Sequence, residues 1–233
     1  DMTMPEEINR IVTDSIADYF FTTSTWASDN LLKYGANASK IHFVGNVMID
    51  SLYQNIDRIK KPTFWDEYQL EQRNYIVLTL HRPSNVDEKE PLLDLLASIN
   101  NLAEDKKIVF PVHPRTKTIL ENTNLHFKNI IYVEPQGYLC FLYLIKNAFV
   151  VITDSGGISE ETTVLDIPCF TLRENTERPE TITLGTNILV GNSTEKLKRF
   201  YSLFLKNGRK KSSIPELWDG KTAERIVSIL LDK

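Results

Sequence analysis

The sequence contains 233 residues, of which 42% are hydrophobic and 25% charged, and its formal net charge is −4 at pH 7. This composition is typical of a globular protein of one or two domains, and the lack of a basic surplus argues against nucleic acid as a partner. The longest apolar run, residues 138–145, is far shorter than the roughly 20 residues of a membrane-spanning helix, so we expect no membrane segment.

The first 45 residues predict two helices and two short strands. Thr3 and Pro5 start a helix that carries acidic residues on its positive end and runs to about residue 17. Strands are expected at 19–22 and 41–44, with a helix between them that begins near residue 25 and ends at Gly35. Because the chain starts with Asp and enters a helix almost at once, we expect it to be part of a longer protein.

From residue 75 onward, apolar strand-like runs alternate with helical patterns. Strands are predicted at 75–80, 108–112, 130–133, 149–153, 168–172 and 187–190. Helices are predicted at 89–102, 116–121, 138–146, 158–165, 194–205 and 222–231. Strands that are apolar throughout and alternate with helices indicate a parallel sheet covered on both faces, so the predicted fold class is α/β, a doubly wound, Rossmann-like sheet.

Two predicted strands are followed directly by residues suited to binding an anion. His81 and Arg82 follow the first of these strands, and His113 follows the next. Ligands of an open parallel sheet bind beyond the carboxyl ends of its strands, so we interpret His81 and Arg82 as site residues. For His113 the alternative, a loop residue before a helix that starts at Pro114, is equally well supported.

The strongest local signal is the turn Thr153-Asp154-Ser155-Gly156-Gly157 at the start of a predicted helix. Glycines allow a ligand to approach the backbone, and the first N–H groups of a helix attract an anion, so this turn predicts a phosphate site. Neither the Walker sequence nor the dinucleotide fingerprint is present. Glu161 is expected to face sugar hydroxyls, whereas Glu160 suits compensation of the helix dipole.

Two further strand ends are less specific. The spacing around Phe141 favours a core aromatic residue over a ring that stacks on a base. Arg173 and Arg178 follow another strand, where they could clamp a phosphate or sugar oxygen, with a solvated charged loop as the alternative. No cluster has metal-ligand spacing. The residues therefore predict a protein that binds a nucleotide or sugar phosphate and leave the reaction open.

Cys140 and Cys169 are the only cysteines, and both lie in apolar runs. We interpret them as buried thiols, not as a disulfide, which fits a reducing compartment.

Several ordered motifs resemble the non-hydrolysing UDP-N-acetylglucosamine 2-epimerase family over nearly the whole chain. The matching segments are residues 4–10, 44–50, 81–82, 111–114, 154–161 and 176–180. The resemblance implies a two-domain fold similar to GT-B glycosyltransferases. Residues 1–45 would end the N-terminal domain, most of which would be absent, residues 46–218 would form the UDP-binding domain, and residues 219–233 would cross back as a helix.

The resemblance also implies an activity and its partners. The family interconverts UDP-N-acetylglucosamine (UDP-GlcNAc) and UDP-N-acetylmannosamine (UDP-ManNAc) by expelling and re-adding UDP through 2-acetamidoglucal, for surface polysaccharide precursors. No cofactor and no metal are implied. We expect a cytoplasmic homodimer, and a chain that does not turn over alone because further acidic residues of the family lie upstream.

Residue roles follow from the same resemblance. It implies catalytic roles for Glu6 and His81, and a second, activating UDP-sugar site at Arg82 and His113. The implied substrate-binding residues are Phe141, Ser155, Gly156, Gly157, Glu161 and Arg178. Many bacterial members have Arg-Glu-Asn where this chain has Pro83-Ser84-Asn85, a departure that bears on the activating site.

Three alternatives remain open at this point. A GT-B glycosyltransferase that uses a UDP-sugar would share the phosphate and uracil sites but would need an acceptor groove. A hydrolysing epimerase would release free N-acetylmannosamine. A non-catalytic module would only bind the nucleotide.

Overall fold

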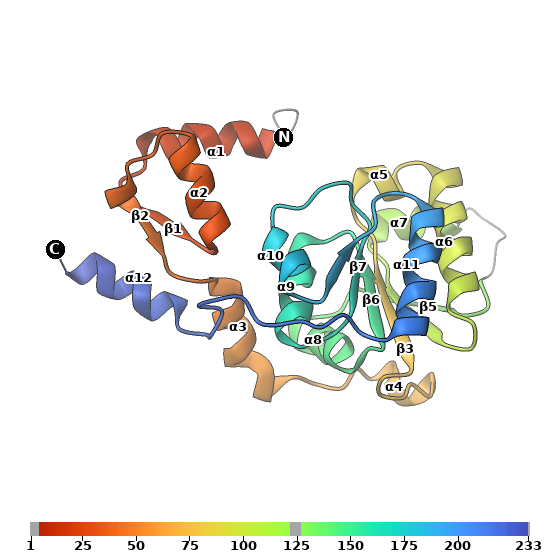
Figure 1. The fold of residues 1–233 in the computed structure, drawn as a ribbon. Helices are drawn as coiled ribbons and strands as arrows, with labels where there is room; N and C mark the ends of the chain where they lie inside the picture. Colours follow the sequence, from red (N-terminus) through yellow and green to blue (C-terminus); the bar gives the residue numbers. More distant parts are fainter. Residues whose placement is uncertain (1–4, 122–126, 233) are drawn as a thin grey trace. The chain divides into compact units, whose positions relative to one another are not determined.

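The computed structural model describes residues 5–121 and 127–232 and divides them into two compact units. The first unit contains residues up to 54 together with residues from 215, and the second contains residues 55–214. Each unit is described by itself, and Figure 1 labels their helices and strands.

The first unit consists of a short parallel sheet with helices. Its two strands pair in parallel, from Phe20 opposite Ile41 to Thr22 opposite Phe43. Its elements are α1 (Pro5–Ile16), β1 (Phe20–Thr22), α2 (Thr25–Lys33), β2 (Ile41–Phe43), α3 (Val47–Asn55) and α12 (Thr222–Leu231). All of these except α3 were predicted from the sequence.

The helix that was missed, α3, is held to the C-terminal segment by buried polar contacts. The Asp50 carboxylate accepts hydrogen bonds from the backbone N–H groups of Thr222 and Ala223 at 3.1 and 2.7 Å. Trp218 donates from its indole nitrogen to the carbonyl of Thr23 at 3.0 Å. The first compact unit therefore extends past the domain boundary expected at residue 45 and takes in residues before 219.

The second unit is built on a six-stranded, entirely parallel sheet in the order β5-β4-β3-β6-β7-β8. The strands are β3 (Tyr75–Thr79), β4 (Lys107–Pro111), β5 (Ile130–Val133), β6 (Val150–Thr153), β7 (Cys169–Thr171) and β8 (Asn187–Leu189). The six strands predicted from apolar runs are all present. Read in chain order from β3, the arrangement is 3-2-1-4-5-6, the Rossmann order, which confirms the predicted doubly wound α/β class.

Helices cover both faces of this sheet, as Figure 1 shows for α6 and α11 on one face and α8 and α9 on the other. The larger helices are α6 (Lys89–Leu102), α7 (Pro114–Glu121), α8 (Tyr138–Asn147), α9 (Gly156–Val164) and α11 (Thr194–Asn207). Three short helices were not predicted: α4 (Phe64–Glu67), α5 (Pro83–Val86) and α10 (Pro179–Thr183).

The strands are apolar throughout because successive side chains enter two different cores. In β3, Ile76 and Leu78 join the core beneath α6 and α11, whereas Tyr75 and Val77 join the core beneath α8 and α9. This alternation follows from the two-residue period of a strand. Burial on both faces fixes the sheet, and its carboxyl edge carries the polar turns.

Candidate functional site

The strand order brings together two turns that are far apart in the sequence. Successive strands are added in one direction from β3 to β5 and in the opposite direction from β6 to β8. The strand order therefore reverses between β3 and β6, which are neighbours. Ligands of doubly wound folds bind in the crevice at such a reversal. His81 and Arg82 follow β3, and the turn from Asp154 to Gly157 follows β6, which places both turns at this crevice.

Asp154 connects the two turns. Its fully buried carboxylate accepts hydrogen bonds from the backbone N–H groups of His81 and Arg82, at 3.0 and 2.9 Å, and from the side-chain amide of Asn85 at 3.0 Å. Burial by itself raises the pKa of Asp154, but these hydrogen bonds and that of the His81 ring outweigh burial and hold the pKa below its usual value. The residue is therefore a fixed, buried negative charge.

His81 is the half-exposed partner of this charge. Its Nδ1 lies 2.8 Å from Asp154 Oδ1. The hydrogen bond to Asp154 raises the pKa of His81, while partial burial and the nearby Arg82 and Arg173 oppose the rise without cancelling it. A protonated imidazole at the mouth of the crevice suits a negatively charged ligand.

The N-terminus of α9 lies in the second turn. Ser155 is the N-cap residue but makes no side-chain capping hydrogen bond, and its own N–H donates to Thr153 Oγ1 at 3.0 Å. The helix starts at Gly156 and Gly157, and the first N–H groups of a helix have no partner within it. These groups and the helix dipole make the turn suited to a phosphate.

Arg173, which follows β7, lies at the same helix end. Its guanidinium is buried, pairs with Glu177 at 2.6 Å, and comes within 3.4 Å of the position that a Cβ on Gly156 would occupy. Burial raises the pKa of Glu177, but the Arg173 hydrogen bond, a backbone hydrogen bond and the charges of Arg173 and Arg82 together hold the pKa below its usual value. The buried Nε of Arg82 makes no hydrogen bond within the described chain. Two guanidinium groups thus join His81 around the α9 N-terminus.

Glu161 lies one turn further along α9 and pairs with Tyr138 of α8. The Tyr138 hydroxyl lies close enough to the buried Glu161 carboxylate to affect its pKa. Burial raises the pKa of Glu161 to about 7, against the lowering effect of Tyr138. Phe141 is half-buried and packs against the core beneath α8. Tyr138, not Phe141, is therefore the aromatic residue that contacts Glu161.

Arg178 is already engaged in the structure. Its Nε donates to the buried Glu160 at 2.5 Å, and its Nη1 donates to the Glu177 carbonyl at 3.1 Å. Glu160 therefore anchors an arginine, whereas the sequence suggested only dipole compensation. The guanidinium remains partly exposed.

Two candidate residues are not among the contacts described above. His113 is exposed at the carboxyl end of β4, two strands from β6. Glu6 is exposed in the first turn of α1 and belongs to the first unit.

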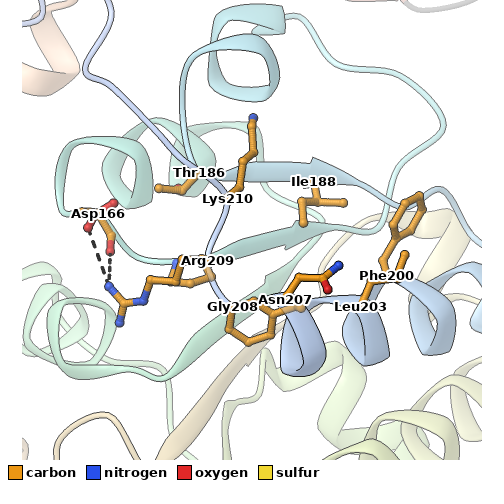
Figure 2. Close-up of a pocket in the computed structure, with 11 residues that line it drawn as sticks. Asp166, Thr186, Ile188, Phe200, Leu203, Asn207, Gly208, Arg209 and Lys210 are labelled. Atoms are coloured by element: carbon orange, nitrogen blue, oxygen red, sulfur yellow. Dashed lines mark hydrogen bonds and ion pairs between the residues drawn. The ribbon is translucent and has the colours of Figure 1, made fainter.

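A hollow at the opposite edge of the same sheet differs in its chemistry. It lies where β7 and β8 begin and α11 ends, with Phe200, Leu203 and Ile188 in its lining (Figure 2). Arg209 pairs with Asp166 at 3.7 Å, and Lys210 donates to the carbonyl of Gly185 at 2.9 Å. The positive charges of Arg209 and Lys210 are thus engaged by neighbouring parts of the fold, so we do not assign this hollow as the functional site.

Other features of the described residues bear on the earlier expectations. No group of three His, Cys, Asp or Glu side chains among them could hold a metal ion. None of the described helices has the length and apolar character needed to cross a membrane. Cys140 and Cys169 are free thiols as predicted, but only Cys169 is fully buried.

The sequence placed Asp154 in the candidate turn, Glu160 in the helix after it and Tyr138 in a predicted helix, without giving any of them these partners. A signal existed for Asp154, because an acidic residue at the end of a buried strand needs donors. Which donors it finds depends on the strand order.

Comparisons with known proteins show which family the chain resembles. The family model described as UDP-N-acetylglucosamine 2-epimerase matches residues 1–231. A relative named UDP-N-acetylglucosamine 2-epimerase from Methanocaldococcus jannaschii is 44% identical over 241 residues. A Pseudomonas aeruginosa relative named UDP-2,3-diacetamido-2,3-dideoxy-D-glucuronate 2-epimerase is 37% identical over 194 residues, covering 82% of this chain and 53% of its own.

Solved structures give the same result. The M. jannaschii UDP-GlcNAc 2-epimerase in complex with UDP-GlcNAc and UDP matches with a TM-score of 0.86 and 43% identity, covering all of this chain and 66% of its own. The Neisseria meningitidis UDP-GlcNAc 2-epimerase bound to UDP-GlcNAc matches with a TM-score of 0.84 and 28% identity, covering 98% of this chain and 65% of its own. The alignment with the M. jannaschii sequence covers 99% of this chain, which spans 65% of that relative's length.

Proposed function

Because the chain belongs to the UDP-N-acetylglucosamine 2-epimerase family, we propose that it is the nucleotide-binding part of an enzyme that interconverts UDP-GlcNAc and UDP-ManNAc. One observation carries this proposal beyond the family match. The α9 N-terminus, His81 and the buried Arg173 meet where the strand order of the sheet reverses. The buried carboxylate of Glu161 lies one turn further along α9. The first three groups suit a diphosphate, and Glu161 suits the ribose hydroxyls of the same nucleotide.

The proposed reaction inverts carbon 2 without a redox step. A base removes the proton from carbon 2, and the electron pair of that bond forms a double bond to carbon 1. The bond from carbon 1 to the diphosphate oxygen breaks, and its electron pair leaves with UDP, giving 2-acetamidoglucal. UDP then adds back to carbon 1 while a proton reaches carbon 2 from the other face. The step needs donors on the leaving diphosphate, which gains charge as the bond breaks.

The residues of the second unit supply those donors in this proposal. The N–H groups at Gly156 and Gly157 hold the diphosphate beside Ser155, and His81 donates to the departing phosphate oxygen. The Glu161 carboxylate accepts from ribose hydroxyls, and Phe141 stacks on uracil. Arg178 binds near the sugar and the diphosphate.

Two assignments rest on the family resemblance alone. Glu6 acts as a catalytic carboxylate, together with acidic residues of the relatives that lie outside this chain. Arg82 and His113 contribute to a second UDP-sugar site that activates the enzyme.

The identity of the sugar rests on the names of two relatives. The P. aeruginosa relative is named for a diacetamido glucuronate, so a family member need not take UDP-GlcNAc. We propose UDP-GlcNAc because the more similar M. jannaschii relative is named for it.

Deuterium exchange tests the reaction. The full-length protein is incubated with UDP-GlcNAc in deuterated water, and products are analysed by NMR. Deuterium at carbon 2 with UDP-ManNAc in the product supports the proposal. Transfer without exchange points to a glycosyltransferase, and free N-acetylmannosamine points to a hydrolysing epimerase. Exchange only with the diacetamido sugar would change the substrate and keep the mechanism.

We further propose that the full-length enzyme is a cytoplasmic homodimer. The free thiols of Cys140 and Cys169 suit a reducing compartment. Light scattering on the full-length protein would give the mass, and a monomer across the micromolar range would reject the dimer.

A further inference from the structure

We propose that Asp154 is the positioning residue for His81, holding the imidazole by Nδ1 so that Nε2 is the nitrogen that meets the diphosphate. This inference rests on the function proposed above. The His81 side chain is 53% exposed, whereas that of Asp154 is fully buried, and 2.8 Å separates Nδ1 from Oδ1. The ring edge facing the protein is therefore Nδ1, and Nε2 lies on the other edge.

The Asp154 carboxylate can orient a ring because it cannot rotate. Backbone N–H groups of His81 and Arg82 and the buried amide of Asn85 fix Oδ2 at 3.0, 2.9 and 3.0 Å. Asn85 also donates to the carbonyl of Leu172, at 3.4 Å, so its amide orientation is set as well. With Oδ2 held by three donors, Oδ1 has a fixed direction, and the imidazole that bonds to it inherits that direction.

This bond also determines which tautomer His81 adopts. An ionised carboxylate accepts only, so Nδ1 must carry the hydrogen and Nε2 is free to gain or lose a proton. In the charged ring, Nε2–H donates to the phosphate oxygen that leaves with the electron pair. The groups that act on this ring are Asp154, which raises its pKa, and Arg82 and Arg173, which lower it.

A purely structural role would look different, and the chain supplies an example. Asp50 is also a buried aspartate whose carboxylate accepts two backbone N–H groups, those of Thr222 and Ala223. It stabilises the start of α12 and orients no histidine in the described structure. Asp154 performs the same backbone task and, in addition, holds His81.

A double-mutant cycle in the full-length protein separates the two roles. Asp154→Asn should lower kcat for UDP-GlcNAc about 100-fold, change KM less than about threefold, and shift the His81 limb of the pH profile to lower pH. In a His81→Ala background the same substitution should change kcat by less than about threefold. Asp50→Asn, the matched control, should leave kcat and the pH profile unchanged. An equal kcat loss from Asp154→Asn in both backgrounds would make Asp154 structural and overturn the proposal.

Nitrogen NMR of the imidazole keeps the test decisive if Asp154→Asn does not fold. In the wild-type full-length protein, with His81→Ala for assignment, we expect the Nδ1–H tautomer and a pKa above 6.5. An Nε2–H tautomer would overturn the proposal. These spectra need no turnover, so absence of deuterium exchange in the wild type would reject the epimerase function while leaving the Asp154–His81 pair tested independently.

Discussion

Both edges of the six-stranded sheet carry charged residues, but these residues have different roles at the two edges. At the amino edge, Arg209 and Lys210 bind Asp166 and backbone carbonyls, so their positive charge is consumed within the fold (Figure 2). At the carboxyl edge, Asp154 accepts hydrogen bonds from backbone N–H groups and from the Asn85 amide. The first N–H groups of α9 have no partner within the helix, and the buried Arg82 Nε has no hydrogen-bond partner among the described residues. The difference teaches that a hollow alone does not identify a site. What distinguishes the carboxyl edge is a positively charged side chain, Arg82, whose buried Nε has no hydrogen-bond partner among the described residues.

The largest effect should come from His81 at the carboxyl edge. His81→Ala in the full-length protein should lower kcat about a thousandfold, because general acid–base groups contribute roughly 10²- to 10⁴-fold. The urea midpoint should hardly change, since the ring is half exposed. Steady-state kinetics and urea unfolding measure the two quantities. Comparable losses of kcat and stability would make His81 a structural residue and would weaken the contrast between the edges.

The buried carboxylate of Glu161, at the carboxyl edge, should lower the stability of the folded protein at alkaline pH. Its folded pKa of about 7 lies above the ordinary 4.5, so folding favours the protonated acid. The contribution of Glu161 to the free energy of unfolding therefore falls as the pH rises from about 4.5 to about 7. Glu161→Gln should therefore be more stable than wild type by at most about 3 kcal/mol at pH 8, and by less than about 1 kcal/mol at pH 5. Urea unfolding at both pH values measures this. A gain that is equal at the two pH values would contradict the assigned cause.

Arg178 should affect binding of UDP. Its substitution also removes the guanidinium that contacts the buried Glu160, so the comparison is made between Glu160→Gln and the double variant Glu160→Gln with Arg178→Ala. We expect about tenfold to hundredfold weaker UDP binding in the double variant, as for loss of a charge-assisted hydrogen bond. Calorimetry measures the Kd. Equal affinities would remove Arg178 from the site.

Sequence reasoning predicted most of the fold because the strands have two buried faces. Apolar runs such as that of β3 report this directly. The pattern failed at α3, because no helix was predicted after the strand expected at residues 41–44. In the structure, the Asn46 side chain accepts from the Met48 N–H at 2.9 Å, as an N-cap does, and a helix follows. The short α4, α5 and α10 have too few turns to show a period.

Sequence reasoning singled out candidate residues next to strand ends and did not give their partners. The turn at Gly156 could be proposed from the sequence because glycines permit a ligand to approach the backbone, whatever the strand order. The pairing of His81 with Asp154 requires β3 and β6 to be neighbours, although more than 70 residues separate them. Periodicity gives no such information. The pair of Arg178 with Glu160 was missed for the same reason.

The smallest effect, and the sharpest check on the comparison, is expected at the amino edge. Lys210→Met removes a donor from the Gly185 carbonyl, just after α10, whose first turn follows Arg178. It should cost about 1 kcal/mol of unfolding free energy and leave the Kd for UDP unchanged within about twofold, because the ammonium contacts only backbone carbonyls late in α10 and just after it, those of Ile182 and Gly185. Arg209→Met, which loses Asp166 instead, is the matched control. If Lys210→Met weakens UDP binding while Arg209→Met does not, then α10 transmits the change to Arg178, and the two edges are not independent.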